Sequence, residues 1–571
     1  MASRYSLSAS LPATRKSIHR AQSARTTTAA DPEQQQAAFS LPDLDPEEKL
    51  SVTPHEAWTS PPASSANATN ETVRRDLSVR KGATRSGSNK KKSEAAALKS
   101  EFDSSDATYD ERGYLVLKSA DIFGLTSSSF TEDKSNDEGR TRTNRLAYLE
   151  GLRGILGIQV LLWTFFRIFA PAIVADRDID GVYPAAFLSV APAWQSILRK
   201  VLSPLLFDGE LQASFFIILS GRASLQTFIE RRQALPLAGA AFKRPFRFIL
   251  PMAITVALVS LVIAVDGFRH ASLLSTSLSN QLASPPAQFS SALEYWNTLF
   301  FFFSTPTYYK IARATTMIPP SGTLWIIPVL FQQTYVLIIL AFTLPFTVLR
   351  YKNMGMILLI LTTAWVGRFS WYTLTGLLIA EWSTVYRQVL PGGKIPLNRA
   401  GTRFVAAWVP GMVFAVVGVM FKYLWIAGLP ADAQNEIVAH VDGNTGKLNY
   451  DLDPARVAFP RYDNWLVATG VLFLIELSPR AQRSLSTPLL KYAGRWAFSI
   501  SLISGTLMLS LGSLLRYHLT ASLGWTNPAT ILAVLFAALI PASLVVVEVY
   551  ARLVDDGALW VSNWLFRWIR V

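Results

Sequence analysis

The chain contains few side chains that could act as a base near neutral pH. Its 571 residues include five histidines and no cysteine. The absence of cysteine excludes disulfides, thiolate nucleophiles and cysteine metal sites. Two of the histidines, His19 and His55, lie in a polar N-terminal segment, whereas His270, His440 and His518 lie in predicted loops or at helix edges. His270 and His518 are each a candidate for a catalytic base, and each also fits an ordinary histidine of a surface loop.

Five further charged side chains lie inside or beside apolar stretches, where a charge needs a partner or a water-filled cavity. Arg167 lies within the first apolar stretch, and pairing with Glu381 or Glu476 is one of three interpretations of it. Binding of an anionic headgroup and extension of the arginine toward the membrane surface are the alternatives. Asp208 and Glu210 either form an acidic site or mark the beginning of the second apolar stretch.

Apolar runs of membrane-spanning length dominate the chain after residue 145. Half of all residues are hydrophobic, and the mean hydropathy is positive. A bilayer core about 30 Å thick requires about 20 apolar residues in a helix. The sequence therefore predicts an all-α polytopic membrane protein with about ten transmembrane helices, near residues 155–174, 205–221, 247–266, 324–348, 355–367, 371–386, 404–428, 464–477, 496–515 and 529–552.

The two ends of the chain differ from this domain, which spans residues 146–552. Residues 1–145 are rich in Ser, Ala, Thr and Lys, so we expect a disordered, basic N-terminal tail. Residues 553–571 place Trp560, Trp564 and Trp568 on one helical stripe. This pattern predicts an amphipathic helix at the membrane interface, although an aromatic edge packed on the last spanning helix fits it equally.

Charge between the apolar runs predicts the orientation in the membrane. Basic residues gather in 222–247, 387–403 and 478–495, whereas 429–463 is acidic and 267–323 is nearly free of basic residues. By the positive-inside rule, the basic segments and both termini are cytosolic, and the two long loops face the lumen or the exterior.

Six sequence motifs occur in one order along the apolar domain. They are YLEGLRG at Tyr148–Gly154, FFIILSG at Phe215–Gly221, KRPFRFILP at Lys243–Pro251, LWIIPVLFQ at Leu324–Gln332, TGLLIAE at Thr375–Glu381 and GRWAFSISL at Gly494–Leu502. Together they resemble the acyltransferase-3 family in its fungal type. The family consists of ten-helix membrane proteins that transfer acyl groups, often acetyl, from acyl-CoA to hydroxyl groups.

Three positions depart from the pattern that this resemblance implies. Thr164 stands where the family has the histidine that follows the arginine of the first motif, Arg153, by eleven residues. Leu330 replaces an acidic residue, and Gly505 replaces a further histidine. Threonine can donate a hydrogen bond but cannot accept a proton at neutral pH. The family's expected catalytic histidine and acid are therefore not retained, and no catalytic residue is assigned.

The arginines of the family pattern are retained. The resemblance implies that Arg153, Arg244 and Arg247 line a cytosolic opening and bind the phosphates of acyl-CoA. Guanidinium groups suit this role because they make paired hydrogen bonds to phosphate, although the positive-inside rule alone also accounts for arginines there. Gly151, Gly154 and Gly157 are spaced for close helix packing.

The resemblance implies an acyltransferase-like protein that acylates a lipid, glycan or secondary metabolite, with acyl-CoA as co-substrate and no permanently bound cofactor or metal. An inactive acyl-CoA or lipid binder and a transporter or flippase are the alternatives. Membrane lipids are the expected surroundings, and no nucleic-acid partner is expected. The fungal character of the motifs suggests the endoplasmic reticulum, the Golgi or the plasma membrane.

Overall fold

The computed structural model describes residues 135–174, 186–231, 234–304, 317–343, 347, 349–386, 394–396, 404–430, 436, 439–441, 446–448 and 458–570. Residues 1–134 of the predicted tail, with His19 and His55, lie outside the described residues, as does Val571. The described part is mostly helical.

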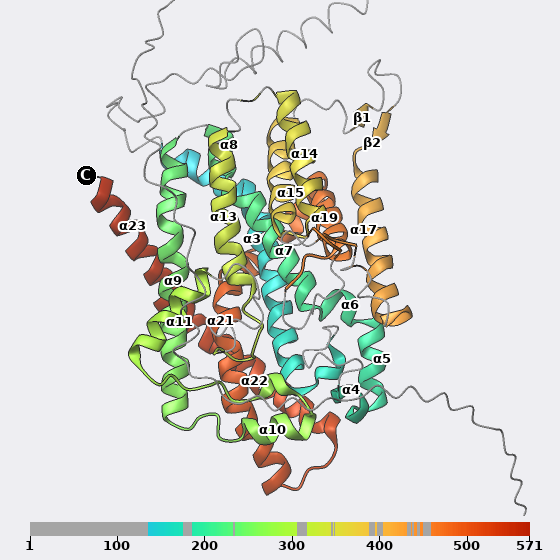
Figure 1. The fold of residues 1–571 in the computed structure, drawn as a ribbon, viewed down its shortest axis with the longest axis vertical. Coiled ribbons are helices and arrows are strands. Elements are labelled where there is room, and N and C mark those ends of the chain that lie inside the picture. Colours follow the sequence, from blue (N-terminus) through green and yellow to red (C-terminus); the bar gives the residue numbers. More distant parts are fainter. Residues whose placement is uncertain are drawn as a thin grey trace, which may run out of the picture. The chain divides into compact units, whose positions relative to one another are not determined.

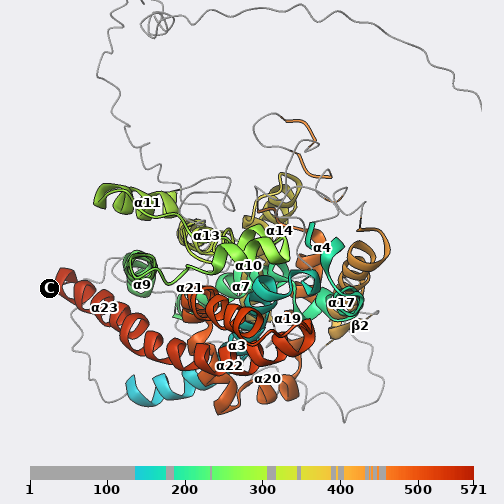
Figure 2. The ribbon, with the colours of Figure 1, turned by 90° about the horizontal axis from the view of Figure 1, so that it is seen from below.

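Each of the ten predicted apolar windows overlaps a helix, although the window 404–428 begins in the strand β2 (Phe404–Ala406) (Figure 1). These helices are α3 (Ser135–Phe169), α7 (Gly209–Ser224), α9 (Ala234–Ala264), α13 (Ile326–Thr343), α14 (Leu349–Trp365), α15 (Ser370–Glu381), α17 (Trp408–Tyr423), α19 (Tyr462–Leu477), α21 (Pro488–Tyr517) and α22 (Pro528–Tyr550). Viewed at a right angle in Figure 2, several of them are seen nearly end-on, as expected for helices that share one direction.

Five of the described helices are long and apolar enough to cross a membrane, and a sixth is added if two helices bent by 60° count as one span. The five lie at Leu146–Phe169, Leu235–Ala264, Trp408–Gly428, Pro488–Ser522 and Pro528–Ile569, and the bent pair joins Ala193–Val201 to Ser203–Ser224. The protein is therefore helical with several apolar helices of membrane-spanning length. The number ten and the orientation stay predictions.

Shorter elements complete the described part. They are α4 (Ala186–Val190), α5 (Ala193–Val201), α6 (Ser203–Leu206), α8 (Gln226–Arg231), α10 (Ala271–Leu278), α11 (Ala292–Ser304), α20 (Pro479–Leu485), α23 (Asp556–Arg570), the 3₁₀ turns η2 (Pro171–Ile173) and η3 (Gln281–Ala283), and the π-helical turns η5 (Trp382–Tyr386), η7 (Leu424–Gly428), η9 (His518–Ser522) and η10 (Ala551–Asp555). A two-stranded antiparallel ribbon pairs β1 (Lys394–Pro396) with β2 (Phe404–Ala406), Ile395 opposite Val405.

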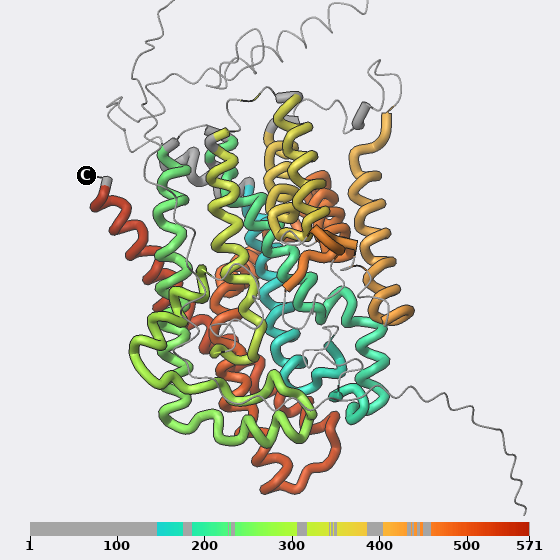
Figure 3. Tube along the Cα trace, in the orientation of Figure 1, coloured from blue at the N-terminus to red at the C-terminus, as the bar shows by residue number. Residues whose placement is uncertain are grey.

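The closest helix packing joins α3 to α21, which lie side by side although far apart in sequence (Figure 3). On α21, a Cβ on Gly154 would stand 2.2 Å from the Leu490 oxygen, and one on Gly157 would stand 3.0 Å from the Cα of Ala497. A Cβ on Gly151 would stand 1.8 Å from the oxygen of Leu485, the last residue of the preceding helix α20. The predicted packing role of these glycines is confirmed. Because contacts advance along both helices together, α3 and α21 run parallel, which places Thr164 level with Gly505.

The C-terminal helix α23 continues from α22 through the π-helical turn η10 and packs on α9. Lys243 Nζ lies 4.8 Å from the ring centre of Phe566. Trp560, Trp564 and Trp568 are all more than half exposed, so the tryptophan stripe is not packed against the described helices. An exposed aromatic stripe is the arrangement that an interfacial helix requires, and its place in a membrane stays a prediction.

Candidate functional site

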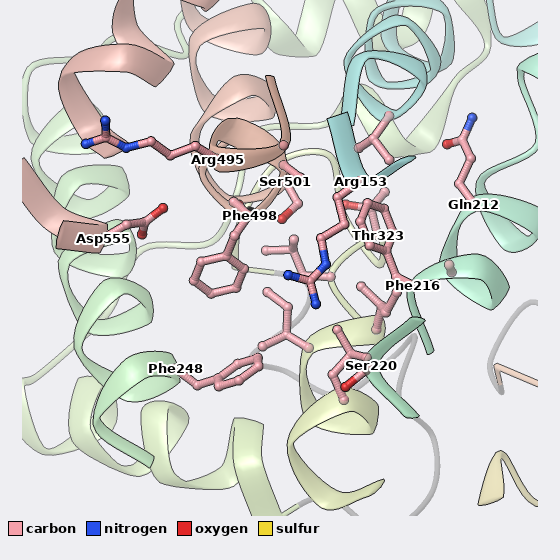
Figure 4. A pocket seen from close by; sticks show the side chains of 18 of the residues that line it. Arg153, Gln212, Phe216, Ser220, Phe248, Thr323, Arg495, Phe498, Ser501 and Asp555 are labelled. Carbon is pink, nitrogen blue, oxygen red and sulfur yellow. Dashed lines mark hydrogen bonds between the residues drawn. The ribbon is translucent and has the colours of Figure 1, made fainter. Parts of the chain in front are cut away.

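A cavity of about 810 Å³ lies between α3, α7, α9, α13 and α21 (Figure 4). It brings together the three predicted phosphate-binding residues, Arg153, Arg244 and Arg247. The three positions at which the chain departs from the family pattern, Thr164, Leu330 and Gly505, line the same cavity. Six residues that were singled out from four separate segments therefore line one partly enclosed cavity.

Basic side chains gather at one end of the cavity. The guanidinium of Arg153 projects into the centre of the view in Figure 4, between Phe498 and Ser220. Arg244 donates to Ser220 Oγ at 3.1 Å and lies 4.9 Å from the ring centre of Phe248. Arg153 and Arg247 have no hydrogen bond or ion pair with any described residue. Guanidinium groups held in this way present free donors to a ligand.

The net charge of the lining is positive. Five basic side chains face the cavity, Arg153, Arg244, Arg247, Lys491 and Arg495, against three acidic ones, Glu150, Asp555 and Asp556. Arg495 is paired with Asp556. A partly enclosed, positively charged space attracts anions, and it does so more strongly than an open surface because water screens the charges less.

Asp555 is the acidic group most closely held at this end. It is the last residue of the π-helical turn η10, and such turns often occur at functional sites. Ser499 donates its hydroxyl to one carboxylate oxygen of Asp555, and the other oxygen, Oδ1, is buried without a hydrogen-bond partner among the described residues. The cavity therefore has one carboxylate oxygen able to accept a proton or a hydrogen bond.

The three positions that differ from the family pattern have different surroundings. Thr164 is buried, and its hydroxyl donates to the Val160 oxygen at 2.8 Å. Leu330 contributes an apolar side chain from α13. At Gly505, a Cβ would stand 2.1 Å from the Pro319 oxygen, so the loop before α13 fills the space that a histidine side chain would need.

None of the three described histidines lines this cavity, so the structure does not place a relocated base from His270 or His518 there. The His270 ring stacks on Tyr517 with ring centres 4.1 Å apart, and His518 begins the π-helical turn at the end of α21. His440 is fully buried and its Nδ1 donates to the Ala364 oxygen at 2.7 Å. Burial lowers the pKa of His440, so its ring is neutral near pH 7.

The interpretation that Arg167 pairs with Glu381 or Glu476 is wrong. Glu476 binds Nε of Arg222 at 2.7 Å, and Glu381 binds Lys352 at 2.8 Å. The Arg167 guanidinium lies 4.8 Å from the ring centre of Trp163, and its charge interacts with that of Glu210. The packing of the helices thus places a different oppositely charged side chain beside each of Arg167, Glu381 and Glu476.

Asp208 does not line the cavity but caps a helix and joins an ionic network. Its Oδ1 accepts from the backbone N of Glu210 at 2.9 Å, which stabilises the first turn of α7, and its other oxygen pairs with Lys422. Lys422 also lies 3.8 Å from Asp463, which binds Arg461 at 3.0 Å. The sequence analysis did not predict this network. Lys422, a single lysine inside the apolar run 404–428, could have indicated it, because a charge in such a run needs a partner.

Sequence reasoning also missed the neutral polar lining. Gln212, Thr323 and Ser501 face the same cavity from α7, from the loop before α13 and from α21. Ser501 lies four residues before Gly505, on the same face of α21, and could have been found from that spacing.

Comparison of the chain with family models, with curated proteins and with solved structures gives no match.

Proposed function

We propose that this protein is a membrane-embedded, acyltransferase-3-like protein that binds acyl-CoA in the cavity between α3, α7, α9, α13 and α21. The observation that carries the proposal is the convergence of Arg153, Arg244 and Arg247 on this space. The three come from two separate motifs, and two of them have no protein partner within the described part of the chain. Phosphate oxygens would satisfy those free donors.

The rest of the cavity suits the remainder of an acyl thioester. Phe216, Phe248, Ile327 and Leu330 supply an apolar lining beyond the arginines. Burying an acyl chain there stabilises the complex by about 0.8 kcal/mol for each CH₂ group removed from water. A ligand with phosphates at one end and an apolar chain at the other therefore matches both parts of the cavity.

Binding is tested with the purified full chain in lipid nanodiscs, titrated with acetyl-CoA and with longer acyl-CoAs. Arg153→Ala, Arg244→Ala and Arg247→Ala should each weaken binding by about 10- to 100-fold, because a hydrogen bond to a charged group is worth about 1.5–3 kcal/mol. The matched control is Arg552→Ala, an exposed arginine that pairs with Glu548 outside the cavity. Absence of acyl-CoA affinity, with movement of a substrate across proteoliposomes, would favour a transporter instead.

Acyl transfer is a second candidate function, and the free Oδ1 of Asp555 favours it. In this reaction, Asp555 takes the proton of an acceptor hydroxyl while the hydroxyl oxygen attacks the thioester carbonyl carbon. The carbon–sulfur bond then breaks, and the CoA thiolate receives the proton. Loss of a positioned general base costs about 10²- to 10⁴-fold in rate.

Transfer is measured with radiolabelled acetyl-CoA and total lipid extract. If the protein is an enzyme with Asp555 as its base, Asp555→Asn should lower turnover and leave acyl-CoA affinity within a few fold. Acyl-CoA binding without any turnover in the unsubstituted protein would identify an inactive binder.

A further inference from the structure

At one end of the cavity, the polar side chains are uncharged and offer a ligand hydrogen-bond acceptors rather than donors. Four side chains form this end: Thr164 on α3, Gln212 on α7, Thr323 before α13 and Ser501 on α21. A hydroxyl carries one proton and two lone pairs, so a hydroxyl that donates to the backbone has only acceptor capacity left. The partner of each hydroxyl proton therefore decides which ligand this end can bind.

All three hydroxyl protons are used by backbone oxygens. Thr164 donates to Val160 at 2.8 Å, Thr323 to Pro320 at 2.8 Å and Ser501 to Phe498 at 2.7 Å. The lone pairs of these oxygens remain for a ligand.

Gln212 also offers a hydrogen-bond acceptor to a ligand, because its amide nitrogen is already bound to the backbone. Its Nε2 donates to the Leu206 oxygen at 2.9 Å, which fixes the orientation of the amide. Its Oε1 is buried without a hydrogen-bond partner among the described residues, and only 1% of the residue is exposed. An unsatisfied buried acceptor costs about 1–3 kcal/mol, so a donor that reaches it is bound favourably.

The arginines of the basic end lie at a distance from these four side chains. Arg153 precedes Thr164 by eleven residues on α3, about 16 Å along the helix. Arg244 is bound to Ser220, which follows Gln212 by eight residues on α7, about 12 Å away. The nearest charges, Arg167 three residues after Thr164 and Glu210 two residues before Gln212, interact with each other. Because these two charges compensate each other, the four oxygen acceptors favour a neutral donor over an anion or a cation.

We infer that Thr164, Gln212, Thr323 and Ser501 form a subsite for an uncharged, hydroxyl-bearing compound, with the Gln212 amide oxygen as its acceptor. Hydroxyl groups fit better than amide N–H groups, because an amide also brings a carbonyl oxygen for which these four side chains offer no donor. The inference rests on the proposed binding of acyl-CoA and does not involve Asp555, which lies at the basic end: the compound would lie in the same cavity as acyl-CoA, beyond the arginines.

The test uses the full chain in phosphatidylcholine nanodiscs and two probes with the same tail, n-octyl-β-D-glucoside and octanoate, below their micelle concentrations. The glucoside should bind measurably and depend on Gln212, whereas binding of octanoate, whose carboxylate suits the arginines, should depend on Arg153 and be unchanged by Gln212→Leu. Gln212→Leu should weaken glucoside binding by about tenfold and Thr164→Val by less, because one hydrogen bond is lost in each. The matched control is Thr506→Val, a buried threonine of α21 that does not line the cavity. Partitioning into the lipid is common to all variants and cancels.

Equal glucoside affinity in the unsubstituted protein and in Gln212→Leu would overturn the inference, as would octanoate binding that weakens in Gln212→Leu as much as glucoside binding does. Weaker CoA binding in Gln212→Leu, with unchanged affinity for adenosine 3′,5′-bisphosphate, would place the amide arm of CoA on Gln212 and would also overturn it. Arg153→Ala separates the two proposals, because it should weaken acyl-CoA binding and leave glucoside binding unchanged.

Discussion

The Nε of Arg222 on α7 lies 2.7 Å from Oε1 of Glu476 on α19, and both side chains are almost fully buried. The same carboxylate oxygen accepts the hydroxyl of Tyr148 at 2.6 Å. Tyr148 begins the first motif, so one end of that motif fastens α3 to α7 and α19, while Arg153, five residues later, faces the cavity. A single motif thus contributes to both stability and binding.

Removal of the carboxylate should destabilise the protein strongly. Glu476→Gln leaves the Arg222 charge buried without a counter-ion, and breaking such a pair costs about 3–5 kcal/mol. Thermal unfolding in nanodiscs measures the change. Arg552→Ala breaks an exposed pair and should leave the melting temperature nearly unchanged. Equal melting temperatures for Glu476→Gln and the unsubstituted protein would contradict the buried pair.

The two roles of the first motif should separate in two substitutions. Tyr148→Phe removes the hydrogen bond to Glu476 and should lower stability by about 1–3 kcal/mol without changing acyl-CoA affinity. Arg153→Ala should do the reverse, because Arg153 has no hydrogen bond or ion pair with the described residues. Melting curves and acyl-CoA titrations of both variants provide the comparison, and a loss of affinity in Tyr148→Phe at full stability would contradict the division.

The close approach at Gly505 predicts that the histidine position cannot simply be restored. Gly505→Ala should destabilise by about 1–3 kcal/mol, because its Cβ would meet the Pro319 oxygen at 2.1 Å. The matched control is Gly355→Ala in α14, where no heavy atom lies within 4 Å of the new Cβ. That change should stabilise by about 0.5–1 kcal/mol, since alanine favours helix. Equal effects of the two substitutions on the melting temperature would refute the packing at Gly505.

The buried imidazole of His440 predicts a pH dependence of stability. Burial lowers its pKa in the folded state, so the unfolded chain binds the proton more readily. The contribution is present above the unfolded pKa of about 6.5 and is lost as the pH falls below it. His440→Phe should therefore show a smaller decrease in melting temperature between pH 7 and pH 5. An identical decrease in both proteins would contradict this and show that the pKa of His440 is the same in the folded and the unfolded state.

The sequence predicted the helices well and their contacts less well. Apolar runs determine helix position directly, and all ten windows overlap helices. The glycines of α3 could be interpreted because their spacing repeats on one helical face. The convergence of Arg153 with Arg244 and Arg247 followed the resemblance and agrees with the cavity lining.

The partners of buried charges could not be predicted in the same way. For Arg167, pairing with Glu381 or Glu476 was one interpretation, yet each of these acids binds a different cation. Which charges meet depends on the rotation and depth of every helix, and a one-residue shift changes the partner by 100° around the axis. The free acceptor of Gln212 could not be predicted either, because it depends on which backbone oxygen the amide nitrogen binds.

The most direct test of the central claim is a cryo-electron microscopy map of the full chain in nanodiscs with saturating acyl-CoA. The proposed function predicts density in the cavity between α3, α7, α9, α13 and α21, with phosphate oxygens within hydrogen-bond distance of Arg153, Arg244 and Arg247. An empty cavity at saturating ligand, or acyl-CoA bound with its phosphates away from these arginines, would contradict it.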